Sequence, residues 1–116
     1  MNKKYLYSVV VPVYNSSKTL SILTKQIADF FLSKSFSFEI IFVNDFSQDD
    51  SLNILKELKK DAPFPIKILS LAFNSGQHRA LQAGFQYADG EFILTIDDDL
   101  QYTPFDFSLL IEKQKE

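Results

Sequence analysis

Residues 5–13 have the sequence YLYSVVVPV, in which most side chains are aromatic or β-branched. Bounded by Pro12 and Asn15, this continuous apolar run predicts a strand that is buried on both of its faces. Similar runs predict three more strands, at residues 38–43, 66–71 and 92–96. Buried strands of this kind are typical of a parallel sheet whose two faces are both covered by helices.

Amphipathic stretches between and after these runs predict four helices. Ser16 or Ser17 is expected to cap the first helix, and Asp49 or Asp50 the second. Pro104 suits the first turn of the last helix. The expected helices span about residues 17–34, 51–60, 77–88 and 104–116, and Asp89 and Gly90 are expected to form a tight turn after the third of them.

The alternation of strands and helices predicts one α/β domain over residues 1–116, without internal repeats. Its expected form is a Rossmann-like, open and mostly parallel sheet with helices on both faces. A change in strand order within such a sheet opens a crevice at the carboxyl ends of the strands, where ligands bind. The residues that follow the strands are therefore the candidate site residues.

Composition argues against several classes of protein. The net charge of −3 disfavours a nucleic-acid-binding module, which normally has a basic face. The absence of cysteine excludes disulfides, thiolate metal sites and a cysteine nucleophile. No apolar run reaches the roughly 20 residues that a membrane-spanning helix needs, and the start of the chain lacks a signal-type cleavage site. We therefore expect a cytoplasmic location for this segment.

The first strand is followed by a segment that contains Pro12, Val13, Tyr14 and Asn15. A proline that closes a strand, followed by polar residues, leaves backbone N–H groups and a helix N-terminus at the crevice. Such a site favours an anion or a polar ring edge. The same residues are also compatible with a simple, well-capped turn.

Asp45 lies at the carboxyl end of the second predicted strand. Its carboxylate is a candidate acceptor for an N–H of a nucleotide base, because a buried strand rarely ends in a carboxylate that has no use. Asp49 and Asp50 are better explained by their favourable interaction with the N-terminus of the next helix.

The fourth strand leads into Asp97, Asp98 and Asp99, and Gln101 follows. Three consecutive carboxylates repel one another, and a divalent cation with oxygen ligands relieves that repulsion. In an extended segment Asp97 and Asp99 would lie on one side and Asp98 on the other. The pattern predicts a site for a metal and a diphosphate; the alternative is an exposed acidic turn that caps the last helix.

A polar turn before the third helix contains Gly76, His78 and Arg79. Arg79 is a candidate contact for a diphosphate, since guanidinium groups bind phosphate oxygens through paired hydrogen bonds. His78 is the one histidine of the chain, and at the start of a helix it is more typical of a structural residue than of a catalytic base.

Four segments together resemble the inverting glycosyltransferases of family two, which have the GT-A fold. The segments are SVVVPVYN at residues 8–15, EIIFVND at 39–45, NSGQH at 74–78 and DDDLQ at 97–101. The similarity is greatest to polyprenyl-phosphate sugar transferases of the dolichol-phosphate mannose synthase type, in which a phrase such as DADLQ, followed shortly by proline, is the metal motif. The resemblance covers essentially the whole chain and implies the nucleotide-sugar-binding half of a GT-A fold.

The resemblance also implies roles for individual residues. Asp45 would hold the base, Pro12 and Tyr14 would line the nucleoside pocket, and Asp98 would lie near the ribose or face solvent. The candidate nucleotide-sugar contacts are Pro12, Val13, Tyr14, Asn15, Asp45, Gly76, Arg79, Asp97 and Asp98. The implied ligands of Mg²⁺ or Mn²⁺ are Asp97, Asp99 and Gln101.

Two features depart from the family pattern. Phe46 stands where a glycine often follows the acidic residue, and Ser16 and Ser17 stand where an acidic residue often follows the asparagine of the first motif. Family members usually continue for about 100 further residues, close to a second domain. That continuation would supply the acceptor site and a membrane-associated tail. No catalytic residue is assigned within the chain, because any general base would lie beyond Glu116.

The implied activity is transfer of a sugar, with inversion, from a nucleoside-diphosphate sugar to a lipid phosphate or a glycan. Membrane association is expected only through the continuation of the chain, and self-association through uncovered apolar surface is also expected. A Rossmann oxidoreductase is disfavoured, because residues 12–15 lack a glycine-rich turn. A receiver-like module is disfavoured by the missing carboxylates at the same place. The alternative that stays open is a non-catalytic nucleotide-binding or assembly module derived from a glycosyltransferase.

Overall fold

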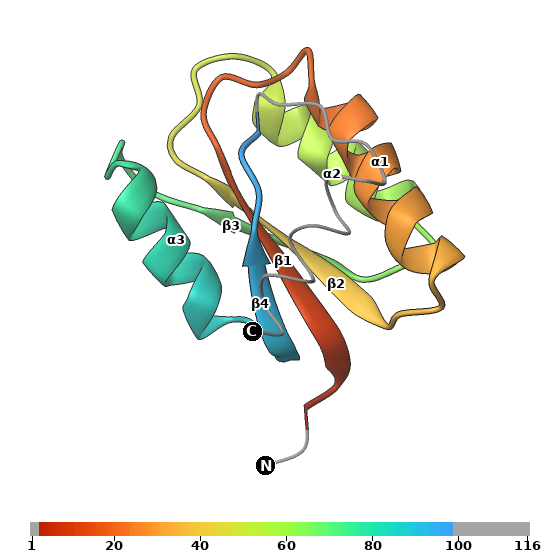
Figure 1. Ribbon diagram of the computed structural model, residues 1–116. Helices are drawn as coiled ribbons and strands as arrows, with labels where there is room; N and C mark the ends of the chain where they lie inside the picture. Colours follow the sequence, from red (N-terminus) through yellow and green to blue (C-terminus); the bar gives the residue numbers. More distant parts are fainter. Residues whose placement is uncertain (1–2, 99–116) are drawn as a thin grey trace.

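The computed structural model describes residues 3–98, which alternate between strand and helix (Figure 1). The elements are β1 (Tyr5–Val13), α1 (Leu20–Ser33), β2 (Phe38–Asn44), α2 (Ser51–Asp61), β3 (Ile66–Ser70), α3 (Gln77–Gln86) and β4 (Gly90–Thr95). This order confirms the four predicted strands and the first three predicted helices. The helix expected at residues 104–116 lies outside the described residues. No helix within the described part of the chain is long and apolar enough to cross a membrane.

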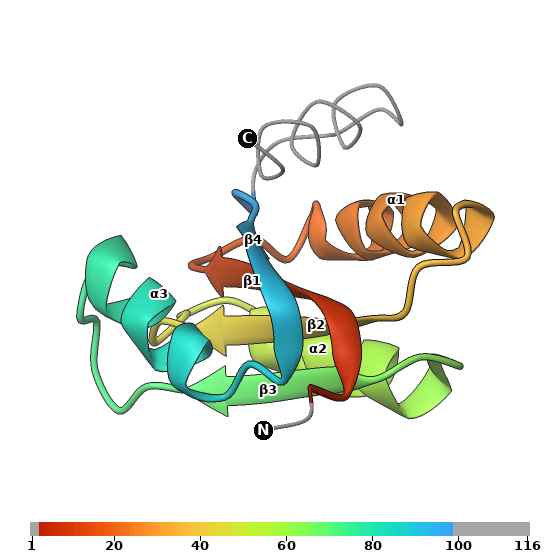
Figure 2. The ribbon, with the colours of Figure 1, turned by 60° about the horizontal axis from the view of Figure 1, so that its bottom comes forward.

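All four strands are parallel, and their order in the sheet is β3-β2-β1-β4. The chain moves outward from β1 through β2 to β3 and then returns to the other side of β1. Helices α1 and α2 cover one face of the sheet, and α3 covers the other (Figure 2). The predicted Rossmann-like sheet is thus confirmed, and its order reverses between β1 and β4, where such sheets bind ligands.

The main core lies between the sheet and the pair α1 and α2. Val9, Val11 and Val13 alternate along β1 and face this core, where they meet Leu23 and Ile27 of α1. All five side chains are buried. Burial of a side chain of this size contributes about 1.5–3 kcal/mol, so this face is the main source of stability.

The opposite face has a smaller core. Val10, Ile41 and Val43 of the sheet contact Ala80 of α3. Gly84 lets the helix approach closely, because a Cβ at that position would lie 2.5 Å from Cγ1 of Val10. Small residues therefore hold α3 against the sheet and fix the position of its N-terminus at the carboxyl end of β1.

The predicted cap of the first helix was wrong. Helix α1 begins at Leu20, and its N-cap residue Thr19 makes no side-chain capping hydrogen bond. The hydroxyl of Ser16 donates instead to Asp98, far away in the sequence. Ser17 belongs to the turn that precedes the helix. Ser16 thus forms a long-range hydrogen bond in place of the predicted local cap of α1.

A prediction near β4 was also wrong. Gly90 was expected in a tight turn but is the first residue of β4, where a Cβ would lie 2.5 Å from the backbone nitrogen of Ser8. Close contact between the backbones of β1 and β4 explains why glycine stands at position 90.

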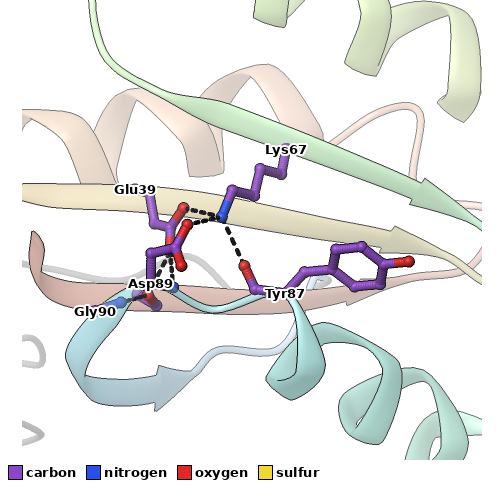
Figure 3. A network of polar contacts seen from close by, with 6 residues as sticks. Glu39, Lys67, Tyr87, Asp89 and Gly90 are labelled. Carbon is purple, nitrogen blue, oxygen red and sulfur yellow. Dashed lines mark hydrogen bonds and ion pairs between the residues drawn. The ribbon is translucent and has the colours of Figure 1, made fainter. Parts of the chain in front are cut away.

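A charged cluster around the buried Glu39 joins the strands on the α3 face (Figure 3). Glu39 of β2 is fully buried, and its Oε1 lies 2.9 Å from Nζ of Lys67 in β3. Its Oε2 accepts hydrogen bonds from the hydroxyl of Ser8 at 2.6 Å and from the N–H of Asp89 at 2.7 Å. Nζ of Lys67 also lies 2.8 Å from the carboxylate of Asp89. The cluster therefore connects β1, β2 and β3 to the start of β4.

The charged state of this cluster follows from its contacts. Burial alone would lower the pKa of Lys67, but hydrogen bonds to Asp89 and Glu39 outweigh it and raise the pKa. The hydrogen bond from Lys67 lowers the pKa of Asp89 below its usual value. Both shifts favour the ionised forms, so Lys67 and Asp89 stay charged at neutral pH.

Candidate functional site

A cavity of about 440 Å³ opens at the carboxyl ends of the strands. Its volume lies within the range typical of small-ligand sites. The segments that follow all four strands contribute to its wall. The lining residues are Pro12, Val13, Tyr14, Asp45, Asn74, Gly76, Gln77, Asp97 and Asp98.

Two candidate residues, Asn15 and Arg79, do not line this cavity. Arg79 is exposed on the first turn of α3. Asn15 has a left-handed backbone with a φ of 52°, which asparagine tolerates. Its N–H donates to Oγ of Ser47 at 3.0 Å, and its Oδ1 accepts from the N–H of Gln48 at 2.7 Å. Asn15 therefore ties the loop after β1 to the loop after β2.

The loop after β2 contains Phe46 at the position where glycine is common in the family pattern. Phe46 has a φ of 59°, a conformation that a bulky residue rarely adopts. Its side chain is exposed, so the departure from the pattern changes the surface of the loop without filling the core.

Asp49 closes the same loop. Its Oδ1 accepts a hydrogen bond from the N–H of Ser51 at 3.0 Å, and its Oδ2 accepts one from the N–H of Ser17 at 3.1 Å. Partial burial acts to raise the pKa of Asp49, but the hydrogen bonds from Ser51 and Ser17 outweigh it and lower the pKa to about 2. Of the two predicted caps of α2, Asp49 is the one whose carboxylate binds the start of the helix.

Asp45 is buried, with 5% of its surface exposed, and it holds the turn before α3. Its Oδ1 accepts a hydrogen bond from the N–H of Ser75 at 2.7 Å, and its Oδ2 accepts one from the N–H of Gly76 at 3.0 Å. Each carboxylate oxygen can accept a second hydrogen bond. The carboxylate can therefore fix this turn and still accept a hydrogen bond from a ligand in the cavity.

The turn before α3 adds two lining residues that were not among the candidates, Asn74 and Gln77. Gly76, between them, has a φ of 88°, which suits glycine. The N-terminus of α3 lies at the cavity, and its positive end favours negative charge. A glycine directly before a helix, with an asparagine two residues before it and a glutamine directly after it, was the sequence signal that would have identified both residues.

Asp97 and Asp98 follow β4 and have partners on different walls of the cavity. Oδ1 of Asp97 accepts a hydrogen bond from Nε2 of Gln77 at 3.3 Å. Oδ2 of Asp98 accepts hydrogen bonds from the N–H of Tyr14, at 2.9 Å, and from the hydroxyl of Ser16. The two carboxylates thus diverge, and Asp98 is bonded to the loop after β1 rather than turned to solvent. The remaining predicted metal ligands, Asp99 and Gln101, lie outside the described residues.

Together these hydrogen bonds form a closed ring around the cavity. Asp98 joins the end of β4 to the loop after β1, and Asn15 joins that loop to the loop after β2. Asp45 then joins the end of β2 to the turn before α3. Gln77 completes the ring at Asp97. The shape of the cavity therefore depends on the relative positions of all four strands.

A second cavity, of about 590 Å³, lies between α1 and α2. Its wall combines apolar side chains such as Leu32 and Leu58 with carboxylates such as Asp29 and Glu57. None of the candidate site residues within residues 3–98 belongs to its wall. The smaller cavity at the strand ends is therefore the candidate functional site.

The chain matches the model of glycosyl transferase family 2 over residues 8–116. It is 37% identical to the uncharacterized glycosyltransferase YkcC of Bacillus subtilis (strain 168), over 100% of this chain and 36% of that protein. It is 36% identical to the undecaprenyl-phosphate 4-deoxy-4-formamido-L-arabinose transferase of Pseudomonas syringae pv. syringae (strain B728a), over 90% of this chain and 31% of that protein. The chain thus spans about a third of the length of these curated relatives.

Solved protein structures share the fold of this chain. S. aureus TarS 1-349 in complex with UDP-GlcNAc has a TM-score of 0.75 at 29% identity, covering 97% of this chain and 32% of that chain. The mannosyltransferase PcManGT from Pyrobaculum calidifontis, in complex with GDP-Man and Mn²⁺, has a TM-score of 0.73 at 18% identity, covering 95% and 32%, and shares the fold. The parallel sheet, the cavity at its strand ends and the match over residues 8–116 agree: the chain belongs to glycosyl transferase family 2 and has a GT-A-type fold.

Proposed function

We propose that this chain forms the donor-binding part of a glycosyltransferase that uses a nucleoside-diphosphate sugar. One observation carries the proposal: the cavity combines carboxylates from the ends of β2 and β4 with the N-terminus of α3. A donor of this class contains a base with N–H groups, a hydroxyl-rich sugar and an anionic diphosphate. The cavity offers a chemical counterpart to each of these parts.

In the proposed binding mode Asp45 accepts a hydrogen bond from the base. Pro12 and Tyr14 enclose the nucleoside, and the 48% exposure of Tyr14 beside the cavity supports this role. The diphosphate lies near Gly76 and the N-terminus of α3, whose dipole favours negative charge. Arg79, exposed on the first turn of α3, is a proposed contact at the rim.

The end of β4 is the proposed site of a divalent cation, Mg²⁺ or Mn²⁺. Asp97 lines the cavity with a carboxylate, the ligand type that a hard cation prefers. Within residues 3–98 no group of three or more His, Cys, Asp or Glu side chains is assembled for a metal. Asp99 and Gln101 are the further proposed ligands. When bound, the cation would stabilise negative charge on the departing nucleoside diphosphate. Two proteins that share this fold were solved with Mn²⁺.

The proposed reaction is a single displacement at the anomeric carbon, with inversion. An acceptor oxygen forms a bond to that carbon while the bond to the diphosphate oxygen breaks, and the electron pair leaves with the nucleoside diphosphate. A lipid phosphate is already anionic and needs no strong base. A sugar hydroxyl must lose its proton to a base, which we assign to chain beyond Glu116.

A polyprenyl phosphate is the proposed acceptor class. Relatives named as undecaprenyl-phosphate sugar transferases support it, since they are 36% identical to this chain over about 90% of its length. A glycan is the alternative acceptor. A lipid acceptor would place the reaction at the cytoplasmic face of a membrane.

Calorimetric titration of UDP and GDP into the full chain, with Mn²⁺ or with EDTA, tests the donor site. We expect one of the nucleotides to bind with Mn²⁺ and to bind at least roughly tenfold more weakly in EDTA, because the diphosphate then lacks its counter-charge. Asp97→Asn should remove this metal dependence. The matched control is Asp29→Asn, which neutralises an exposed carboxylate of α1 and should leave it unchanged.

If neither UDP nor GDP binds in a metal-dependent way, the proposed function is contradicted. Metal-dependent binding by the full-length protein, without transfer of a sugar from any nucleoside-diphosphate sugar, would favour the non-catalytic alternative.

A further inference from the structure

Asp98 stands in the middle of the acidic run, yet its side chain is bonded to the loop after β1. Its Oδ2 accepts hydrogen bonds from the N–H of Tyr14, at 2.9 Å, and from the hydroxyl of Ser16. Its main-chain oxygen accepts a third from the hydroxyl of Thr19, at 2.7 Å. One residue thus receives three hydrogen bonds from a segment that lies 79 to 84 residues away in the sequence.

These hydrogen bonds begin where the pairing of β1 with β4 ends. The last registered pair is Val10 with Thr95, and the N–H of Ile96 donates to the carbonyl of Val10 at 3.1 Å. Strand β1 continues to Val13 with β2 as its partner. Asp98 supplies the next connection between the β1 segment and the chain that follows β4.

We propose that Asp98 is a positioning residue that fixes the separation of two walls of the cavity, rather than a ligand of the ribose or the metal. Tyr14 on one wall and Asp97 on the other both line the cavity. A hydrogen-bonded residue between them sets how far apart they stand. This inference rests on the proposed function, because the separation matters for the donor that the cavity is proposed to bind.

The donors around Asp98 give its side chain partners within the protein. A backbone N–H and a hydroxyl donate to the same carboxylate oxygen, which fixes the direction of the side chain. Ser16 is 8% exposed, so its hydroxyl makes this hydrogen bond with little competition from water. The side chain of Asp98 is therefore held by the loop after β1.

Two substitutions separate a positioning role from a charge-dependent one. Asparagine can replace Asp98 as an acceptor, since its amide oxygen can receive both hydrogen bonds. Alanine cannot accept either of them. A role toward a cation would need the negative charge, and asparagine would then fail as alanine does.

Amide hydrogen exchange of the ligand-free full chain tests the connection itself. In Asp98→Ala we expect the Tyr14 amide to exchange at least roughly tenfold faster than in the wild type, because its acceptor is lost. In Asp98→Asn the rate should stay within about threefold of the wild-type rate. Ser16→Ala removes one donor and should give an intermediate rate. Exchange of the Tyr14 amide that is unaffected by Asp98→Ala would overturn the proposal.

Calorimetry with UDP or GDP tests the consequence for binding. Asp98→Ala should weaken binding roughly tenfold with Mn²⁺ and with EDTA alike, whereas Asp98→Asn should weaken it by no more than about threefold. Equal losses in both variants, together with loss of the metal dependence, would show a charge-dependent ligand and overturn the proposal. If the alanine variant does not fold, Ser16→Ala takes its place. Ser16→Ala removes a hydrogen bond to Asp98 and keeps the charge, whereas Asp98→Asn keeps the hydrogen bonds and removes the charge.

The two experiments also distinguish this inference from the proposed function. If the wild type binds neither nucleotide, the proposed function fails, and the exchange rate of the Tyr14 amide still decides whether Asp98 makes the connection.

Discussion

Asp45, Asp49 and Asp98 are each held by neutral donors, the N–H and O–H groups of neighbouring loops. Such hydrogen bonds stabilise a carboxylate without a counter-ion and also fix its direction. Glu39 is the contrasting case, because it is fully buried and paired with Lys67. In this protein a carboxylate near the strand ends therefore connects segments of the chain, whether or not it also contacts a ligand.

Replacement of Asp49 by asparagine is expected to lower the free energy of unfolding by about 1–2 kcal/mol at pH 7. An amide nitrogen cannot accept a hydrogen bond, so either Ser51 or Ser17 loses its acceptor. Urea denaturation measures the change. Asp50→Asn is the matched control, because the side chain of Asp50 makes no capping hydrogen bond to α2. An equal loss in both variants would mean that helix-dipole electrostatics alone explains the effect.

The stabilisation by Asp49 should depend on pH. Its pKa in the folded protein is lowered to about 2, below the value of about 3.9 in an unfolded chain. The contribution is therefore fully present above pH ~4 and declines as the pH falls toward 2. The difference in unfolding free energy between wild type and Asp49→Asn should accordingly be smaller at pH 3 than at pH 7. A difference that grows on acidification would contradict the assignment.

At the scale of elements, the strands were predictable and the starts of the helices were less so. β1 and β2 are continuous apolar runs, and a sheet covered on both faces requires such runs. The start of α1 was misplaced because Ser16 resembles a local cap, whereas its hydroxyl is used by Asp98 at the far end of the sequence. Gly90 was assigned to a turn because glycine is common in turns, and its close contact with β1 is visible only in three dimensions.

A substitution at Gly84 in helix α3 tests whether side-chain packing or helix propensity has the larger effect on stability. Gly84→Ala should lower the free energy of unfolding by about 1–3 kcal/mol, although alanine is the better helix former. The new Cβ would lie 2.5 Å from Cγ1 of Val10 and 3.2 Å from Cγ2 of Val43, so the helix would have to move away from the sheet. Urea denaturation should show a smaller penalty in a Val10→Ala background, because the contacted methyl group is gone. Stabilisation by about 1 kcal/mol would instead mean that propensity dominates.

At the scale of the whole molecule, the cavity exists only when all four strands are assembled. Its wall takes residues from every strand end, and the ring of hydrogen bonds joins those ends to one another. A ligand that contacts this wall must stabilise the sheet as a unit, because binding to the folded state alone shifts the folding equilibrium.

Thermal unfolding should reveal this coupling. At about 100 times its dissociation constant, the nucleotide that binds with Mn²⁺ should add about 2.7 kcal/mol of stability. For a domain of this size the midpoint should then rise by roughly 10 °C. Scanning calorimetry should record one transition that moves as a whole. A ligand-dependent shift confined to a separate minor transition would show that the cavity unfolds independently of the sheet.

The sequence predicts a candidate site at the strand ends, where the structure has a cavity, but it does not predict the whole cavity wall. Asp45 and Asp97 were expected there and line the cavity, since both follow a strand at the crevice. Asn15 was expected there but does not line the cavity, and Gln77 lines it but was not expected, because hydrogen bonds between distant loops decide which side chain faces the cavity. Such pairings are not encoded in any single segment of the chain.

The buried position of Glu39 restricts how β2 can align with its neighbours during assembly. In the native register Glu39 lies opposite Ser8 and reaches Lys67. A slip of one residue would turn its carboxylate into the apolar core under α1 and α2, where an unpaired charge is strongly unfavourable. A slip of two residues would keep the face but separate the charge from its partners. The cluster thereby discriminates between strand alignments whose apolar contacts are otherwise similar. A misaligned sheet leaves the charge of Glu39 buried without its partners, so its free energy is higher than that of the native sheet.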